Sequence, residues 1–106
     1  MKLGIIINTS EPEIVWNAYR IANFSLKKGD NVKVFLLAKG VESEIGSEEY
    51  NIKKQLSTFL KNGGKILACE TCMKSRQMSN RKTCPLSSMK DLYQIVKESD
   101  KVLTFG

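Results

Sequence analysis

The stretch KILACETCMKSRQM, residues 65–78, decides the predicted fold, because a short apolar run there ends directly in a pair of cysteines. Ile66, Leu67 and Ala68 predict a buried strand, and Cys69 and Cys72 follow at its carboxyl end. Open α/β sheets bind and transform ligands at the carboxyl ends of their parallel strands. The stretch therefore predicts a parallel sheet and locates its functional site.

Two cations, Lys74 and Arg76, follow the cysteines at once. A neighbouring cation lowers the pKa of a thiol and so favours the thiolate, which is the reactive form. The chain has no histidine, so catalysis by a Cys-His pair and metal binding by histidine are excluded. We therefore expect the Cys69 sulfur to lie open, ionisable and next to positive charge.

The rest of the chain alternates between strand-like and helix-like segments. Apolar runs predict further strands at residues 2–8, 31–37 and 101–105. Helices are predicted from a capping box at Ser10 and Glu13 to about Lys28, from Glu48 or Glu49 to Asn62, and from Ser87 or Ser88 to about Glu98. A loop with a short helical turn is expected at residues 38–47, and a partly helical loop at residues 73–84.

This alternation implies right-handed crossovers between parallel strands. We predict a single domain over residues 1–106, of the α/β class. Its architecture is a three-layer sandwich, in which a parallel sheet of roughly four to five strands carries helices on both faces. The first helix has more apolar residues than one sheet-facing stripe requires, so part of it is expected to pack against another subunit.

The carboxyl ends of parallel strands meet at one edge of a sheet. Cys69 is therefore expected to share that edge with Asn8 and Thr9, Ala38 and the C-terminus. Tyr50 and Asn51 begin the second predicted helix and are candidates to line the same edge. Helix packing and capping is the favoured role for this pair. The candidate substrate-binding residues are Asn8, Thr9, Tyr50, Asn51 and Lys74.

Charge and composition limit the partners. The 106 residues include 17 basic and 11 acidic side chains, a net charge of +6, which we interpret mainly as a solvated basic surface. No aromatic residue interrupts the basic run at 74–82, so no nucleic-acid partner is expected. No apolar run approaches the ~18 residues that span a bilayer, and the N-terminal run lacks a signal cleavage site. We expect a cytoplasmic protein without a membrane partner.

Three interpretations of the cysteines remain open from the residues alone. They could be small half-buried residues without chemistry. With Cys84 they could bind a metal, although zinc sites usually have four protein ligands and a fourth is not evident. They could also be reactive, with one nucleophilic thiolate that carries a persulfide. No resident metal and no cofactor is predicted.

Three segments resemble one known family. YNIKKQL (residues 50–56), CETCMKSR (69–76) and the closing SDKVLTF (99–105) look like the DsrE/DsrF-like sulfur-relay family, particularly its YchN-like branch. The first helix is also similar around Trp16 and Asn17. The resemblance therefore spans nearly the whole chain.

The resemblance implies a compact α/β domain that assembles as a homotrimer or homohexamer. Relatives carry sulfur as a cysteine persulfide between sulfur-donor and sulfur-acceptor proteins. By position, the resemblance implies that Cys69 is the sulfur carrier and that Arg76 is the arginine that relatives have seven positions later. Gln77 stands where the family has glycine. Cys72 could resolve the persulfide or simply pack in the loop, and Cys84 matches no family position.

We therefore predict a small sulfur-carrier protein whose catalytic residues are Cys69, Cys72 and Arg76. The Cys69 thiolate would attack the sulfane sulfur of a donor and pass it to an acceptor, with or without turnover as an independent enzyme. The alternative is a non-catalytic oligomeric module whose cysteines bind a metal or form a regulatory disulfide.

Overall fold

The computed structural model describes residues 1–44, 46–78 and 86–106 of the chain. Five parallel strands form one sheet in the order β4-β3-β2-β1-β5. The strands are β1 (Lys2–Ile7), β2 (Asn31–Leu36), β3 (Lys65–Cys69), β4 (Leu86–Ser87) and β5 (Lys101–Phe105). The helices are α1 (Pro12–Lys27), the 3-10 helix η1 (Ala38–Glu42), α2 (Ile52–Lys61), α3 (Glu70–Ser75) and α4 (Met89–Glu98).

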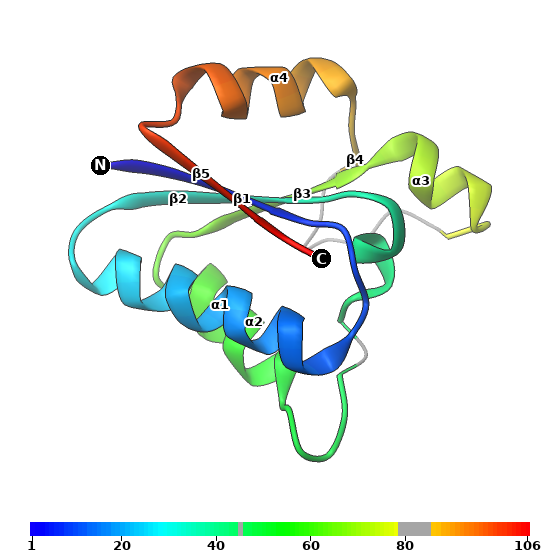
Figure 1. The fold of residues 1–106 in the computed structure, drawn as a ribbon, viewed down its shortest axis with the longest axis horizontal. Helices are drawn as coiled ribbons and strands as arrows, with labels where there is room; N and C mark the ends of the chain where they lie inside the picture. The colour runs from blue at the N-terminus through cyan, green and yellow to red at the C-terminus, as the bar shows by residue number, and fades with distance from the viewer. Residues whose placement is uncertain (45, 79–85) are drawn as a thin grey trace.

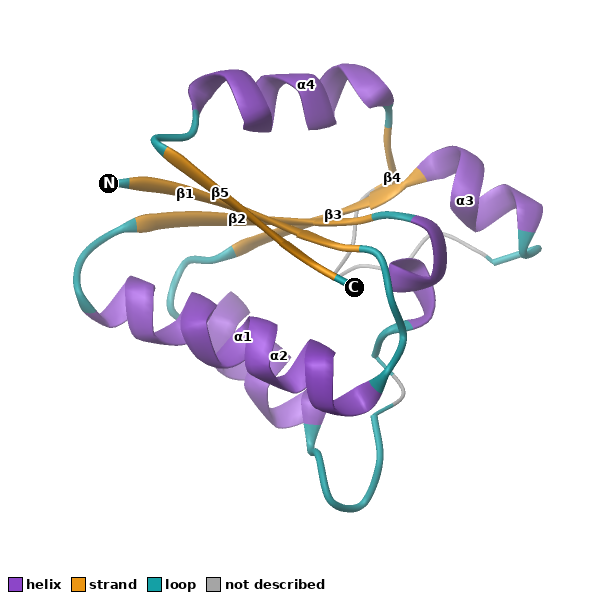
Figure 2. Ribbon diagram, viewed as in Figure 1, coloured by secondary structure: helices purple, strands orange, loops and turns teal. Residues whose placement is uncertain are grey.

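The elements form three layers (Figure 1). Helices α1 and α2 cover one face of the sheet, α4 lies over the other, and α3 extends from the end of β3 (Figure 2). The predicted three-layer α/β architecture, with a parallel sheet and helices on both faces, is therefore confirmed.

The main core lies between the sheet and α1 and α2. Ile5 and Ile7 of the inner strand β1 are fully buried on the face of the sheet that α1 and α2 cover. On α1, the residues Val15, Ala18, Tyr19 and Ala22 are buried, at the spacing of one helical face. The rings of Tyr19 and Phe59 meet edge to face with their centroids 5.9 Å apart, which joins α1 to α2.

Several element boundaries differ from the predicted ones. The first helix is capped by Glu11, whose carboxylate accepts the N–H of Ile14 at 2.9 Å, so the capping box expected at Ser10 and Glu13 is wrong. Helix α2 begins at Ile52 rather than at Glu48 or Glu49. The difference arises because a side-chain cap fixes where a helix begins, and a favourable sequence pattern upstream does not.

The segment after β3 also differs from the expected partly helical loop. The chain enters α3 at Glu70, immediately after the strand. The two-residue strand β4 was not predicted, since a strand this short leaves no periodic pattern. The final helix is capped by Ser88, as predicted. Residues 79–85, which include Cys84 and the end of the expected loop, lie outside the described residues.

Gly40 fixes η1 against the end of β1. A Cβ at Gly40 would overlap the carbonyl oxygen of Ile7, and the same oxygen accepts the N–H of Leu37 at 2.9 Å. The close approach of two backbones leaves no room for any other residue type. The position of η1, and of the residues that it carries, therefore depends on this glycine.

We predict that Gly40→Ala lowers the free energy of unfolding by about 3 kcal/mol, because the added carbon forces backbone away from backbone. Gly29→Ala serves as the control, since a Cβ there meets only open space but the φ of +92° is unfavourable. This control should cost about 1 kcal/mol. Urea denaturation of both variants is the measurement, and an equal or smaller loss for Gly40→Ala would contradict the role of this contact.

Candidate functional site

The two cysteines lie where the chain turns from strand into helix. Cys69 is the last residue of β3 and the N-cap of α3, and Cys72 lies in the first turn of that helix. The Cys69 sulfur accepts the backbone N–H of Cys72 at 3.5 Å. Both side chains are free thiols. The predicted location at the carboxyl end of β3 is confirmed.

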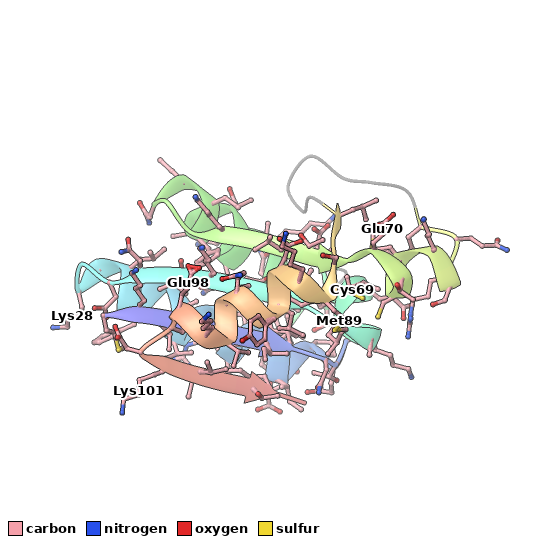
Figure 3. The ribbon with its side chains drawn as sticks, turned by 90° about the horizontal axis from the view of Figure 1, so that it is seen from above. Lys28, Cys69, Glu70, Met89, Glu98 and Lys101 are labelled. Atoms are coloured by element: carbon pink, nitrogen blue, oxygen red, sulfur yellow. The ribbon has the colours of Figure 1, made fainter. Side chains whose placement is uncertain are left out.

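The side chain of Cys69 lies on the face of the sheet that α4 covers. A Cβ at Gly4 would meet Ile95 of α4 and Ser99, the C-cap of that helix, and Gly4, Lys33 and Lys65 are in register across three strands. Cys69 is four residues beyond Lys65 and therefore points to the same face. Figure 3, seen from the α4 side, shows Cys69 at the end of its strand.

Cys69 is nearly sealed from solvent, with 4% of its surface exposed. Burial is the main cause that raises the pKa of the Cys69 thiol above its ordinary value, and a hydrogen bond with the Cys72 side chain adds to the effect. The backbone N–H groups of Cys72 and Thr71 oppose this shift. The expectation of an open, ionisable sulfur at Cys69 is therefore wrong, because desolvation disfavours the thiolate.

The two cations near the cysteines are bound to carboxylates. The ammonium group of Lys74 lies 3.0 Å from Glu70, one helical turn earlier in α3. The Nε of Arg76 lies 3.0 Å from Glu42 of η1. Neither cation is among the causes that shift the pKa of Cys69. The expectation that positive charge adjoins the Cys69 sulfur is wrong, because local ion pairs engage both side chains.

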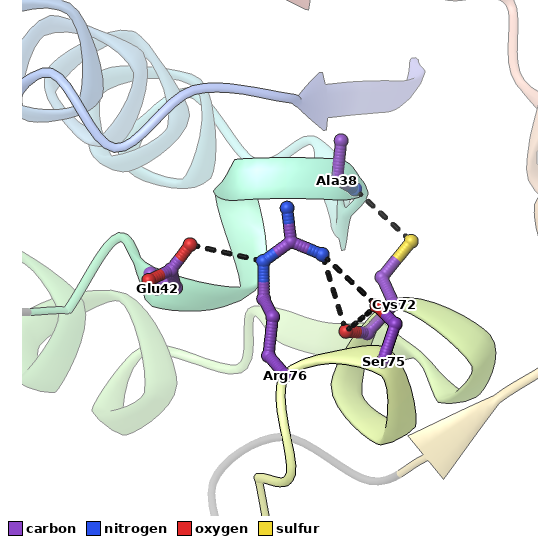
Figure 4. Close-up of polar contacts among 5 residues, drawn as sticks. All are labelled: Ala38, Glu42, Cys72, Ser75 and Arg76. Atoms are coloured by element: carbon purple, nitrogen blue, oxygen red, sulfur yellow. Dashed lines mark hydrogen bonds and ion pairs between the residues drawn. The ribbon is translucent and has the colours of Figure 1, made fainter.

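Arg76 instead connects η1 to α3 (Figure 4). Besides its ion pair with Glu42, its Nη1 donates to the carbonyl oxygen of Cys72 and to the hydroxyl of Ser75, both at 3.3 Å. The side chain of Arg76 is 29% exposed, so solvent only partly screens these contacts. Arg76 therefore holds the backbone around Cys72 in place.

Cys72 is the more accessible of the two thiols. Its side chain is half-buried, and its sulfur accepts the backbone N–H of Ala38 at 3.2 Å. Ala38 has a φ of +52°, in the left-handed region. A residue other than glycine pays about 1–3 kcal/mol for such a conformation and keeps it only where its surroundings enforce it.

The other predicted site residues lie in two places. Asn8 reaches the expected edge, where its N–H donates to Phe105 at 3.0 Å, and Thr9 accepts the N–H of Glu11 at 3.1 Å. Asn51 caps α2 through Lys54, and the Tyr50 ring lies 5.4 Å from that of Trp16 on α1. The capping role of Asn51 is confirmed. The structure places Tyr50 and Asn51 beside α1 and α2.

Glu42 contacts the site but was not among the predicted residues, and Ala38 was predicted only to share this edge of the sheet. The structure places Ala38 at this edge, directly after β2, and adds its contact with the Cys72 sulfur. Glu42 is 34 residues from its partner Arg76, and an ion pair across that separation leaves no signal in the spacing of the sequence.

Gln77 forms the turn after α3, at the position where the resemblance implies glycine. Its φ is +54°, its N–H donates to Lys74 at 3.0 Å, and the N–H of Met78 donates to Met73 at 2.9 Å. This pair of hydrogen bonds is the Schellman motif, which ends a helix with one left-handed residue. The glutamine has therefore not disrupted the turn after α3.

We predict that Gln77→Gly raises the free energy of unfolding by up to about 1 kcal/mol. Glycine removes a left-handed cost of about 1–2 kcal/mol and adds roughly 0.5–1 kcal/mol of backbone entropy loss on folding. Gln77→Ala is the matched control, because alanine has the same dihedral cost as glutamine. Chemical denaturation should show a gain for glycine only, and a loss for glycine would show that the Gln77 side chain itself stabilises the turn.

Over residues 1–44, 46–78 and 86–106, no group of three or more His, Cys, Asp or Glu side chains could hold a metal ion. The metal interpretation also needs Cys84, which lies outside these residues. Among the described helices, none is both long and apolar enough to cross a membrane.

The fold and the site define a parallel three-layer α/β domain with two thiols at the end of its third strand. The chain belongs to the DsrE/DsrF-like family, which it matches over residues 1–105. It is 34% identical over 115 residues to the uncharacterized protein MJ0989 of Methanocaldococcus jannaschii, covering 99% of this chain and 100% of that protein. It is 33% identical over 100 residues to MK0008 of Methanopyrus kandleri, covering 88% and 83%.

Two solved structures share the fold. BT1422 from Bacteroides thetaiotaomicron has a TM-score of 0.78 at 20% identity, covering 97% of this chain and 93% of that one. MTH1491 from Methanobacterium thermoautotrophicum has a TM-score of 0.71 at 10% identity, covering 96% and 97%. Both are described as proteins of unknown function, so this likeness establishes the fold alone.

Proposed function

We propose that this protein is a sulfur carrier that stores a sulfane sulfur on Cys69 and passes it between a donor and an acceptor protein. The observation that supports the proposal is the pair of free thiols at the end of β3, in a chain of the DsrE/DsrF-like family. A compartment that keeps thiols reduced, such as the cytoplasm, suits this chemistry.

The transfer is balanced without an external oxidant. A thiolate of this protein attacks the outer sulfur of a donor persulfide, R–S–SH, the donor S–S bond breaks, and R–S⁻ leaves. The product is a protein persulfide. In the second half, an acceptor thiolate attacks the outer sulfur of that persulfide, which restores the protein thiol and leaves the acceptor as the persulfide.

The burial of Cys69 suits a thiol that stores a sulfane sulfur better than one that takes it from a donor. Thiol exchange depends on access and on the thiolate fraction, and both are low at Cys69 because only 4% of it is exposed and its pKa is raised. Cellular reductants reach a sulfur in this position slowly. The backbone N–H of Cys72 donates to the Cys69 sulfur, and this group and the backbone of Thr71 both act to lower the pKa of the thiol, so they favour negative charge on the sulfur when charge develops.

Sulfur uptake tests this proposal in a Cys84→Ser background, which leaves only the two described thiols. After treatment with a low-molecular-weight persulfide, intact-mass analysis should show a gain of one sulfur atom that survives brief exposure to a thiol reductant. Cys69→Ser should lose this protected sulfur, because the remaining thiol is the accessible one.

Three outcomes would contradict the carrier. A mass that does not change after treatment excludes sulfur uptake. A loss of two hydrogens without a gain of sulfur indicates a Cys69–Cys72 disulfide and supports a regulatory switch. Stoichiometric zinc in the purified protein, lost in Cys72→Ser, supports a metal-binding module.

We also propose that copies of this chain assemble as a homotrimer or homohexamer through the edge of the sheet at β5. Strand β5 is an outer strand, and Leu103 on it is 39% exposed. On α1, Ile21 and Phe24 are 39% and 56% exposed. With Leu3 these side chains line a hollow of about 340 Å³. Exposed apolar side chains gathered at a strand edge are typical of a protein–protein contact.

The oligomeric state tests this surface by light scattering after gel filtration. The protein should have three or six times the chain mass of 11.9 kDa, and Phe24→Glu should shift it toward the single chain because a carboxylate would be buried at the contact. Ser57→Glu on the exposed face of α2 also adds a carboxylate, away from the hollow, and should leave the assembly intact. A monomeric protein, or an assembly that tolerates Phe24→Glu, would contradict the proposal.

A further inference from the structure

The two thiols of the site differ in the ways that set the rate of sulfur exchange. Cys69 has 4% of its surface exposed, and burial raises the pKa of its thiol. Cys72 is half-buried, and Thr71 before it in the first turn of α3 is exposed, whereas Met73 after it is buried. A donor protein can therefore approach the sulfur of Cys72 from solvent far more readily than that of Cys69.

The Cys72 sulfur is also held in one position. The N–H of Ala38 donates to it at 3.2 Å. Ala38 takes up its left-handed backbone because η1 is fixed on both sides, by the close approach of Gly40 to Ile7 and by the ion pair of Glu42 with Arg76. A strained residue that donates to a reactive atom, and that its surroundings hold in place, is typical of a functional site.

Cys72 is connected to Cys69 by a hydrogen bond. Its backbone N–H donates to the Cys69 sulfur at 3.5 Å, and its side chain is among the groups that raise the pKa of the Cys69 thiol, so the two thiols are neighbours. A sulfur atom attached to Cys72 is thus placed next to the buried thiol.

We infer that Cys72 is the first acceptor of sulfur and that it hands this sulfur to Cys69 for storage. This inference rests on the proposed carrier function. First, the Cys72 thiolate attacks the outer sulfur of R–S–SH, and R–S⁻ leaves. Then Cys69 attacks the outer sulfur of Cys72–S–SH and passes its proton to the departing Cys72 sulfur. The products are Cys69–S–SH and Cys72–SH, so no oxidant or reductant is consumed.

Arg76 and Glu42 act here as positioning residues. They hold η1 against α3, so that the Ala38 N–H stays on the Cys72 sulfur, and neither needs to touch the sulfur donor. This differs from the role that the sequence suggested for Arg76, which was direct stabilisation of a Cys69 thiolate.

The order in which Cys72 and Cys69 acquire sulfur tests the inference, and this experiment needs no substitution at the site. Protein that carries only Cys84→Ser is mixed with glutathione persulfide below one equivalent, quenched with an alkylating agent at increasing times, and mapped by peptide mass. Sulfur should be found first on Cys72 and later on Cys69. Sulfur on Cys69 from the earliest time, with none passing through Cys72, would overturn the inference.

Single variants give a second, independent measurement, with circular dichroism to establish that each is folded. Cys72→Ser should slow the loading of Cys69 by about tenfold or more, because the buried thiol must then meet the donor directly. Cys69→Ser should take up sulfur at the rate of the parent protein but lose it rapidly to a thiol reductant.

Glu42→Gln should slow the loading of Cys72 while the subsequent handover to Cys69 keeps its rate. A purely structural role would not separate these two rates. Loading of Cys69 at the parent rate in Cys72→Ser would overturn the inference and leave the carrier function intact. Absence of sulfur uptake in the parent protein would overturn both.

Discussion

The site depends on one hydrogen bond, in which the sulfur of Cys69 accepts the N–H of Cys72 at 3.5 Å. Four N–H groups at the start of any helix lack partners within the helix, and here a thiol at the N-cap satisfies one of them. The strand can therefore turn directly into α3 without an intervening loop. The capping atom is the sulfur of the buried residue Cys69. The same turn therefore fixes Cys69 inside the protein and places the half-buried Cys72 in the first turn of the helix.

This arrangement explains why the two thiols have unequal surroundings. Cys69 ends a strand that is covered by α4, whereas Cys72 lies one helical turn outward, where η1 and α3 meet. A single cysteine cannot be both shielded from reductants and open to a protein partner. In the carrier that we propose, two thiols within four residues of sequence would meet these two requirements separately.

Much of the fold could be predicted from the sequence, because its signals are local. The strand that ends at Cys69, the cap at Ser88 and the alternation of strands with helices all follow from apolar runs and capping residues. The start of α1 could not be placed, since Glu11 and not Ser10 provides the cap. A two-residue strand such as β4 depends on pairing with β3 and leaves no pattern of its own.

The chemical environment of the site was harder to predict. Because Lys74 and Arg76 follow the cysteines in sequence, they were expected beside the thiols, but each forms an ion pair with a carboxylate. Lys74 pairs with Glu70, one helical turn earlier, and Arg76 pairs with Glu42, 34 residues earlier. Charge in a sequence shows which ions are present, and only the tertiary structure shows which atoms they reach. The burial of Cys69 has the same origin, because its side chain points to the face of the sheet that α4 covers (Figure 2), and α4 begins twenty residues further along the chain.

The backbone of Gln77 has a consequence for how relatives of this chain are recognised. Its hydrogen bonds and left-handed φ reproduce the helix ending that a glycine would make. A search pattern that demands glycine after the arginine would discard this chain, although Gln77 takes up a left-handed φ that glycine adopts readily. The turn requires a torsion angle, and in this chain a glutamine provides it.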